Sequence, residues 1–199
     1  MRKRVLYLLA GVAYAALVAG CAGGPHAAPV PEFGAIRPNS IAVMPVMNET
    51  VDMKAPDVVR PIVYNKVIDW GYESPPSSMI DEILAKHNIR EAGEVNQFTA
   101  KELGEMFSVD AILYTTITDW STTWLAVYAS QTVGLRLELK STKDNQVLWE
   151  NKYTYTERAI AGNEKQMVGL AVGAAISPYQ PLVHKVVNRI FRKLPYGGR

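Results

Sequence analysis

The clearest structural signal in the chain is the strict alternation in Gln131-Thr-Val-Gly-Leu-Arg-Leu-Glu-Leu-Lys140. From Val133 to Leu139 every second residue is apolar, while Arg136 and Glu138 separate the leucines. This period of two predicts a strand with one face in the core and the other in water. A turn sequence, Lys143-Asp-Asn145, follows it, and the aromatic run 146–156 predicts the hairpin partner.

Three other segments extend this pattern into a sheet. The run 40–46 (Ser-Ile-Ala-Val-Met-Pro-Val) is almost continuously apolar, as is typical of a strand buried on both faces. The run 110–119 is apolar and β-branched, and 72–74 predicts a short strand. We interpret the hydrophilic stretch 120–124 as a turn between strands.

Five segments have helical spacing of their apolar residues or a helix-start signal. They are 56–70 (regular from Pro61), a segment opened by Ser78 with Asp81, one opened by Thr99 with Glu102, 164–176, and 181–194. Together with the strands they predict a single α/β domain over residues 40–199. Its core is expected to be a mixed sheet of about five strands, with helices on its faces.

The start of the chain predicts export and lipidation. Three basic residues precede an apolar segment, which closes on Val18-Ala-Gly-Cys21, and this arrangement is typical of a secretory signal. Val18 to Cys21 resembles the bacterial lipobox, in which the thiol receives a diacylglycerol and becomes the first mature residue. We therefore predict a signal peptide at 1–20 and a lipidated Cys21 with a flexible, proline-containing linker over 21–39. The alternative is a membrane anchor with Cys21 buried inside it.

Charge is unevenly distributed along the chain. The formal net charge is +2, and loss of the three basic residues of the signal turns it to −1, which gives no support for a nucleic-acid partner. No acidic residue follows Glu164, so the final helix is basic through Lys185, Arg189 and Arg192. These cations either complement the helix dipole on a wet face, or attract anionic lipid or an acidic partner.

Catalytic and cofactor signals are missing from the sequence. It has no Gly-x-Ser-x-Gly elbow and no phosphate-binding glycine loop, and its histidines His26, His87 and His184 have no second His or Cys at metal spacing. We expect no enzyme activity, no cofactor and no metal. The small-residue run 169–173 favours close packing of a helix on the sheet, with contact to the bilayer or a partner as the alternative.

Trp120 and Trp124 are the most suggestive local feature. Two tryptophans in a hydrophilic segment either cap the core, which is slightly favoured, or act as anchors for a partner, since tryptophan is enriched at interface hot spots. With Lys185, Arg189 and Arg192 they are our candidate partner contacts.

The chain resembles a known family at three places: the Ser-Ile-Ala-Val-Met-Pro-Val run, the Trp70-Gly-Tyr72 helix end, and the Ser108-Val-Asp-Ala-Ile-Leu-Tyr114 strand. They resemble a family of bacterial lipoproteins first noticed as genome-derived vaccine antigens, and more distantly CsgG, the amino-terminal domain of TolB and LpoB. The resemblance implies a fold like those of TolB and CsgG. It also implies an envelope protein that works by contact, with a CsgG-like lipoprotein as one expected partner.

Three functional hypotheses follow. The first is a membrane-anchored, non-catalytic interaction or assembly module, accessory to a transport or secretion system. The second is a CsgG-like secretion-channel subunit, which requires ring oligomers, and the third is a periplasmic hydrolase. Ala22, rather than Asp, follows the cysteine, which by the usual sorting rule predicts the periplasmic face of the outer membrane.

Overall fold

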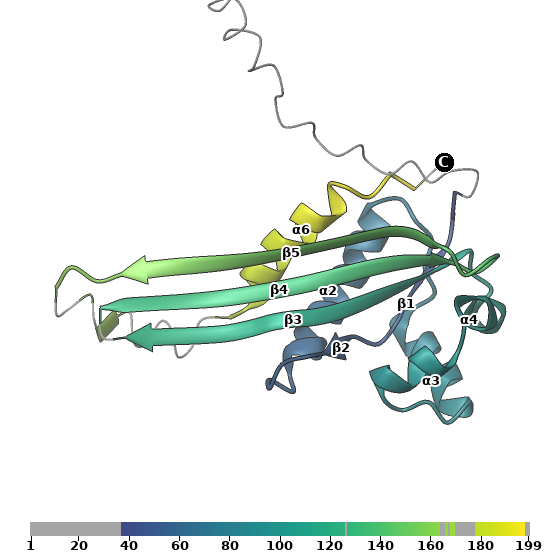
Figure 1. Cartoon of the computed structure of the whole chain (residues 1–199), viewed down its shortest axis with the longest axis horizontal. Helices are drawn as coiled ribbons and strands as arrows, with labels where there is room; N and C mark the ends of the chain where they lie inside the picture. Colours follow the sequence, from purple (N-terminus) through teal and green to yellow (C-terminus); the bar gives the residue numbers. More distant parts are fainter. Residues whose placement is uncertain (1–36, 126, 164–165, 167, 170–177, 198–199) are drawn as a thin grey trace, which may run out of the picture. The chain divides into compact units, whose positions relative to one another are not determined.

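The structure is a computed structural model that describes residues 37–125, 127–163, 166, 168–169 and 178–197. Figure 1 shows three long strands with helices beside them. In chain order the elements are β1 (Ile41–Val43), β2 (Met47–Asn48), α2 (Ala55–Asp69), α3 (Ser77–Lys86), the 3-10 helix η1 (Ala92–Gln97), α4 (Ala100–Phe107), β3 (Ala111–Leu125), β4 (Tyr128–Ser141), β5 (Val147–Ile160) and α6 (Gln180–Phe191).

The sheet is mixed and five-stranded, which confirms the predicted fold class. Its order is β1-β3-β4-β5, and β2 pairs with β3 further along the same edge as β1. Both short strands run parallel to β3, while β3, β4 and β5 form an antiparallel meander. The predicted strand at 72–74 is wrong, because Glu73 makes only an isolated bridge to Ser40. The fifth strand is β2, a two-residue strand directly after the predicted strand 40–46, and it was not predicted.

The stretch 120–124 is part of β3 and not a turn. β3 continues for 15 residues to Leu125, which pairs with Tyr128 of β4, so residues 120–124 lie inside the strand pair. β4 and β5 are 14 residues each, longer than the predicted 131–140 and 146–156. Tryptophan and threonine are good strand formers. Residues 120–125 therefore continue β3 in extended conformation, although their side chains are mostly exposed. A register shift between Ile117 and Asp119 places a bulge at Thr118.

The two faces of the sheet carry separate cores. One face packs against α2 and α6 through a cluster that includes Val63, Leu135 and Phe191. The opposite face packs against α3, η1 and α4 through residues such as Ile80, Leu103 and Ile112. The helices α3 and α4 lie near the first residues of β3, and the long strands extend away from them (Figure 1).

The helix starts agree with the predictions in two of three cases. The Thr99 box forms as predicted: the Thr99 N–H donates to Glu102 Oε2 at 2.7 Å, and the Glu102 N–H donates to Thr99 Oγ1 at 3.2 Å. Helix α2 starts at Ala55 with proline in its first turn, as expected, but the prediction that it is regular only from Pro61 is wrong, because it is α-helical from Ala55 and Pro61 lies inside it. The predicted Ser78–Asp81 cap is wrong. Helix α3 begins at Ser77 with no side-chain cap, and Asp81 pairs with Arg60 instead.

The end of the chain forms a strap, Leu194–Gly197, across the end of α2. Trp70 Nε1 donates to the Leu194 carbonyl at 3.0 Å, and the Tyr72 hydroxyl donates to the Pro195 carbonyl at 2.6 Å. The Tyr196 ring stacks on Trp70 with 4.7 Å between centroids. Gly71, at φ +87°, turns the chain beneath the strap. The predicted final helix is confirmed but ends at Phe191, while the predicted helix 164–176 lies almost wholly outside the described residues.

Candidate functional site

Trp120 lies in the core. Its side chain is 7% exposed, and its ring stacks on Tyr179 at 4.2 Å between centroids and an interplanar angle of 20°. Its Nε1 donates to Asp52 Oδ2 at 3.1 Å, so the buried indole N–H is satisfied. These contacts join β3, the loop before α2 and the start of α6. In this position Trp120 closes one end of the core, and its ring is not accessible to a partner.

Trp124 lies four residues further along β3 and is 51% exposed. Both tryptophans are on the face of the sheet that carries α2 and α6, since strand residues two and four apart share a face. Thr122 lies between them, and its Oγ1 forms a hydrogen bond with the Tyr179 hydroxyl at 2.6 Å. The structure therefore separates the two tryptophans by environment, and only Trp124 presents its ring to solvent.

The cations of α6 lie over the tyrosines of β5. Lys185 Nζ is 3.1 Å from both Glu157 oxygens and 5.1 Å from the Tyr155 ring centroid. The hydrogen bond to Glu157 raises the pKa of Lys185. Arg189 lies over the Tyr153 ring at 5.8 Å. Two of the three candidate cations thus hold the helix on the sheet through cation–π contacts.

Arg192 is placed differently. It follows α6 as its C-terminal cap residue and is exposed. Cys21, the predicted lipidation site, lies outside the described residues. Of the six candidate residues, Trp124 and Arg192 are therefore the two most available for contact.

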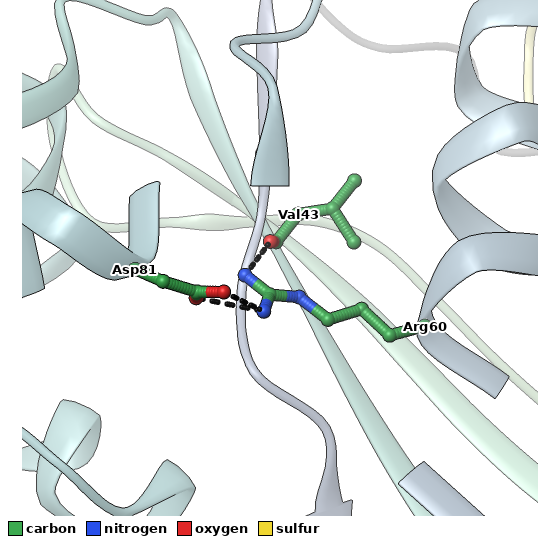
Figure 2. Close-up of polar contacts among 3 residues, drawn as sticks. All are labelled: Val43, Arg60 and Asp81. Atoms are coloured by element: carbon green, nitrogen blue, oxygen red, sulfur yellow. Dashed lines mark hydrogen bonds and ion pairs between the residues drawn. The ribbon is translucent and has the colours of Figure 1, made fainter. Parts of the chain in front are cut away.

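A cleft of about 860 Å³ opens between α2 and the segment around η1, and the sequence did not reveal it. Its walls combine prolines, methionines and Tyr64 with the polar side chains of Asn48 and Asn65. At its base Arg60, whose side chain is 15% exposed, reaches out of α2 (Figure 2). The only sequence signal for a role of Arg60 is its position beside the apolar face of α2. Its partners could not be predicted, because they are distant along the chain.

Arg60 connects three elements. Its Nη1 lies 2.7 Å from Asp81 Oδ1 of α3, and its Nη2 donates to the Val43 carbonyl of β1 at 3.3 Å (Figure 2). The Val43 carbonyl points away from β3, toward the other edge of β1. Without Arg60 it would have no hydrogen-bond donor there. The guanidinium thus satisfies a strand edge and pins two helices to it, which is a structural role.

Asp110 fixes the first residues of the domain. Its Oδ2 accepts hydrogen bonds from the Asn39 N–H at 2.9 Å and from the Ser40 N–H and hydroxyl at 3.0 Å each. Partial burial works against ionisation, but these three hydrogen bonds outweigh it and lower the pKa of Asp110. The predicted linker therefore meets the domain at the beginning of β3.

In the parts of the chain that the structure describes, no three His, Cys, Asp or Glu side chains come together so that they could hold a metal ion. None of the helices there has the length and apolar character of a membrane span.

Together, these features define a mixed α/β domain with a five-stranded sheet and helices packed on both of its faces. The family model described as "Putative lipoprotein GNA1162-like" matches residues 30–191, and the chain belongs to this lipoprotein family. The resemblance seen in the sequence is thereby confirmed. A "Putative lipoprotein NMB1124/NMB1162" of Neisseria meningitidis serogroup B is 26% identical over 166 residues, which cover 83% of this chain and 72% of the relative.

Solved structures show the same fold. The crystal structure of lipoprotein GNA1162 from Neisseria meningitidis matches with a TM-score of 0.59 and 23% identity, over 70% of this chain and 96% of that one. The PelC dodecamer from Paraburkholderia phytofirmans matches with a TM-score of 0.52 and 14% identity, over 79% of this chain and 88% of that one.

Proposed function

We propose that this protein is a non-catalytic envelope lipoprotein, tethered through Cys21, that works by contact with other envelope proteins as an accessory to transport or secretion. One observation carries the proposal. The chain belongs to a lipoprotein family, and its single cysteine lies at the end of a lipobox-like signal. A lone cysteine has no disulfide partner, so lipidation explains its position better than a structural role does.

The length of the tether sets how far the domain can move from the membrane surface. The proposed linker is residues 22–39, and a chain of 18 residues that behaved as flexible coil would have a typical reach of roughly 20–25 Å. Asp110 holds the end of this linker against β3 through Asn39 and Ser40. Ala22 after the cysteine directs the lipoprotein to the periplasmic face of the outer membrane. The tether raises the local concentration of the domain at that surface.

Trp124 and Arg192 are the proposed contact residues. A half-exposed tryptophan offers a large, rigid apolar surface, as is typical of interface anchors. Lys185 and Arg189 contribute charge to the same side of the molecule, although both are held by β5. Trp120 acts indirectly, because its packing fixes the strand that carries Trp124.

Fractionation tests the anchor. Wild-type protein is expected in the outer-membrane fraction, and Cys21→Ala in the soluble periplasmic fraction or as unprocessed precursor. Mass spectrometry of the wild type is expected to show loss of residues 1–20 and a diacylglycerol on Cys21. Equal distribution of the two forms between membrane and soluble fractions would dispose of the tether.

Crosslinking in intact cells, followed by affinity capture, tests the contact role. We expect wild type to recover a reproducible envelope protein, and Trp124→Ala to recover several-fold less of it. Met79→Ala is a matched control, since Met79 is 50% exposed and belongs to α3 rather than to the long strands. Recovery of no envelope protein with wild type, or equal recovery with both variants, would count against this role.

A secretion-channel subunit like CsgG is the second candidate. The observation that favours it is that PelC, which shares this fold, is a dodecamer, so the fold is compatible with large symmetric assemblies. Purified lipoprotein would then form rings and conduct ions across planar bilayers. A monodisperse monomer in detergent that gives no conductance would remove this candidate.

A further inference from the structure

The sheet has two edges without a partner strand among the residues that the structure describes. One edge is β5, which pairs with β4 alone along its 14 residues. The other is the second half of β3, because β2 ends at Asn48 and the last backbone bond on that side runs from the Glu49 N–H to the Ile117 carbonyl. Figure 1 shows β5 and β3 as the outer strands there. Open edges of this length are surfaces that pair readily with another strand.

The register aligns exposed apolar residues at the two edges. Leu125 pairs with Tyr128, and Tyr128 pairs with Ile160, so these three residues form one row across the sheet. The row ends in an exposed aliphatic side chain at each edge: Leu125 is 65% exposed and Ile160 is 78% exposed. A strand that pairs at either edge would bury this apolar area.

The neighbouring row also ends in an exposed apolar side chain at each edge. Trp124 pairs with Ala129, and Ala129 pairs with Ala159, which is exposed. This row lies on the opposite face from Leu125 and Ile160, since successive strand residues point to opposite sides. Both faces of the sheet therefore end in apolar groups at the β3 edge and the β5 edge, at the same level.

Strand direction permits these edges to meet. β3 and β5 both run antiparallel to β4, so they run in the same direction. A second copy placed beside the first in the same orientation would bring β5 of one copy against β3 of the next as a parallel pair. With the rows in line, Ile160 lies beside Leu125 and Ala159 lies beside Trp124.

On the face of the sheet opposite α2 and α6, the charges at the β5 edge are also opposite in sign to the charge at the β3 edge. Lys152 and Arg158 project from β5 on the same face as Ile160, and Asp119 lies on that face at the beginning of the free half of β3. With rows in line, Asp119 lies beside Thr154 of the neighbouring copy, two residues along the strand from Lys152 on the same face. Long basic side chains span this diagonal separation.

We infer that copies of this chain associate head to tail, with β5 of one copy pairing with residues 118–125 of the next. Each copy then uses both edges, and the apolar residues at the ends of the rows are buried. A contact of this kind is heterologous, so it generates a closed ring or an open filament rather than a simple dimer. The inference does not depend on the proposed function, because it concerns contacts between copies of the same chain.

Substitution at the two edges tests the inference in the full lipidated chain, extracted in detergent and weighed by mass photometry over a concentration series. Wild type is expected to form species of more than two copies. Ile160→Lys and Leu125→Glu each place a charge against an aliphatic residue of the neighbour, and each is expected to raise the apparent Kd at least about tenfold. Both residues are exposed, so far-UV circular dichroism should be unchanged.

A matched control lies on the same strand. Val147 is 52% exposed at the beginning of β5, in a row with Lys140 and Ile112. At Ile112 the edge of β3 is covered by Ala42 of β1, so no second copy can pair there. Val147→Lys is therefore expected to leave the assembly unchanged.

Mixing the two variants gives the decisive result. A Leu125→Glu copy keeps a wild-type β5 edge and an Ile160→Lys copy keeps a wild-type β3 edge. An alternating assembly then contains one wild-type junction and one Glu–Lys junction, and large species are expected to return. A β5-to-β5 dimer would not recover on mixing, and that outcome would overturn the inference. So would a wild-type monomer at all concentrations, or edge variants that alter only binding to vesicles or to another protein.

Discussion

Truncation of the chain after Leu194 is expected to destabilise the domain, although of the strap it removes only Pro195, Tyr196 and Gly197. A chain that ends at Leu194 retains the carbonyl that accepts the hydrogen bond from Trp70 Nε1. It loses the Pro195 carbonyl that accepts from Tyr72, the Tyr196 ring on Trp70, and the Gly197 N–H that donates to the Trp70 carbonyl at 3.0 Å.

The expected size follows from these contacts. Tyr72 is 3% exposed, and burial raises the pKa of its hydroxyl, so the lost acceptor leaves a buried donor unsatisfied. That costs about 1–3 kcal/mol. The stacked ring pair contributes about 0.5–1.5 kcal/mol, and the Gly197 hydrogen bond about the same. The free energy of unfolding should fall by roughly 2–6 kcal/mol, a large part of the 5–15 kcal/mol typical of a domain.

Urea unfolding of the detergent-solubilised full chain, followed by tryptophan fluorescence, measures this change. Tyr72→Phe separates the contributions, because without its hydroxyl no donor is left unsatisfied when Pro195 is removed. The truncation should therefore cost about 1–3 kcal/mol less in the Tyr72→Phe background than in wild type. Equal costs in the two backgrounds, or a truncation that changes the unfolding midpoint by less than the error, would refute the reasoning.

Three further predictions concern the polar contacts that fix the domain. Thr99→Ala removes an N-cap and should lower the free energy of unfolding by about 1 kcal/mol, with Thr99→Ser as the control that retains the bond. Arg60→Met leaves the Val43 carbonyl without its donor and should cost about 1–2 kcal/mol in urea unfolding, more than Asp81→Asn, which changes only the half-exposed partner. The lowered pKa of Asp110 stabilises the fold above the ordinary carboxyl pKa near 3.8, and this contribution disappears as pH falls further. Asp110→Ala should therefore be less stable than wild type at pH 6, and the difference should shrink as pH is lowered through 4 to 3.

The sequence predicted the meander because its alternation is local. In a strand with one solvent-exposed face, apolar and polar residues alternate along the sequence. Leu135 and Leu139 therefore identify the core face without any tertiary information. The same signal is absent from residues 128–132 of β4, which are partly buried apart from buried Ala129, and from residues 121–125 of β3, which are exposed. The true extent of β3 and β4 was therefore missed, and the stretch 120–124 was wrongly interpreted as a turn.

The candidate site depended on contacts between distant residues, which local patterns do not reveal. Trp120 is recognisable as important from its type, but its burial follows from Tyr179 and Asp52, which are 59 and 68 positions away. Asp81 has helix-cap spacing with Ser78, yet its carboxylate binds Arg60 because that guanidinium lies buried beside it. Local capping loses to a charge-assisted hydrogen bond when the two compete for the same carboxylate.

The two halves of β3 have different tasks, and their separation has a physical consequence. The first half is enclosed by β1 and α4, and Asp110 beside it holds the end of the linker. The second half carries Trp124, Leu125 and an open edge. At about 3.3 Å per residue these ends lie roughly 45 Å apart, about twice the reach expected of the proposed linker. Under the proposed tether through Cys21, a contact made at the far end would not compete with the anchor for space, so one domain could be anchored and engaged at the same time.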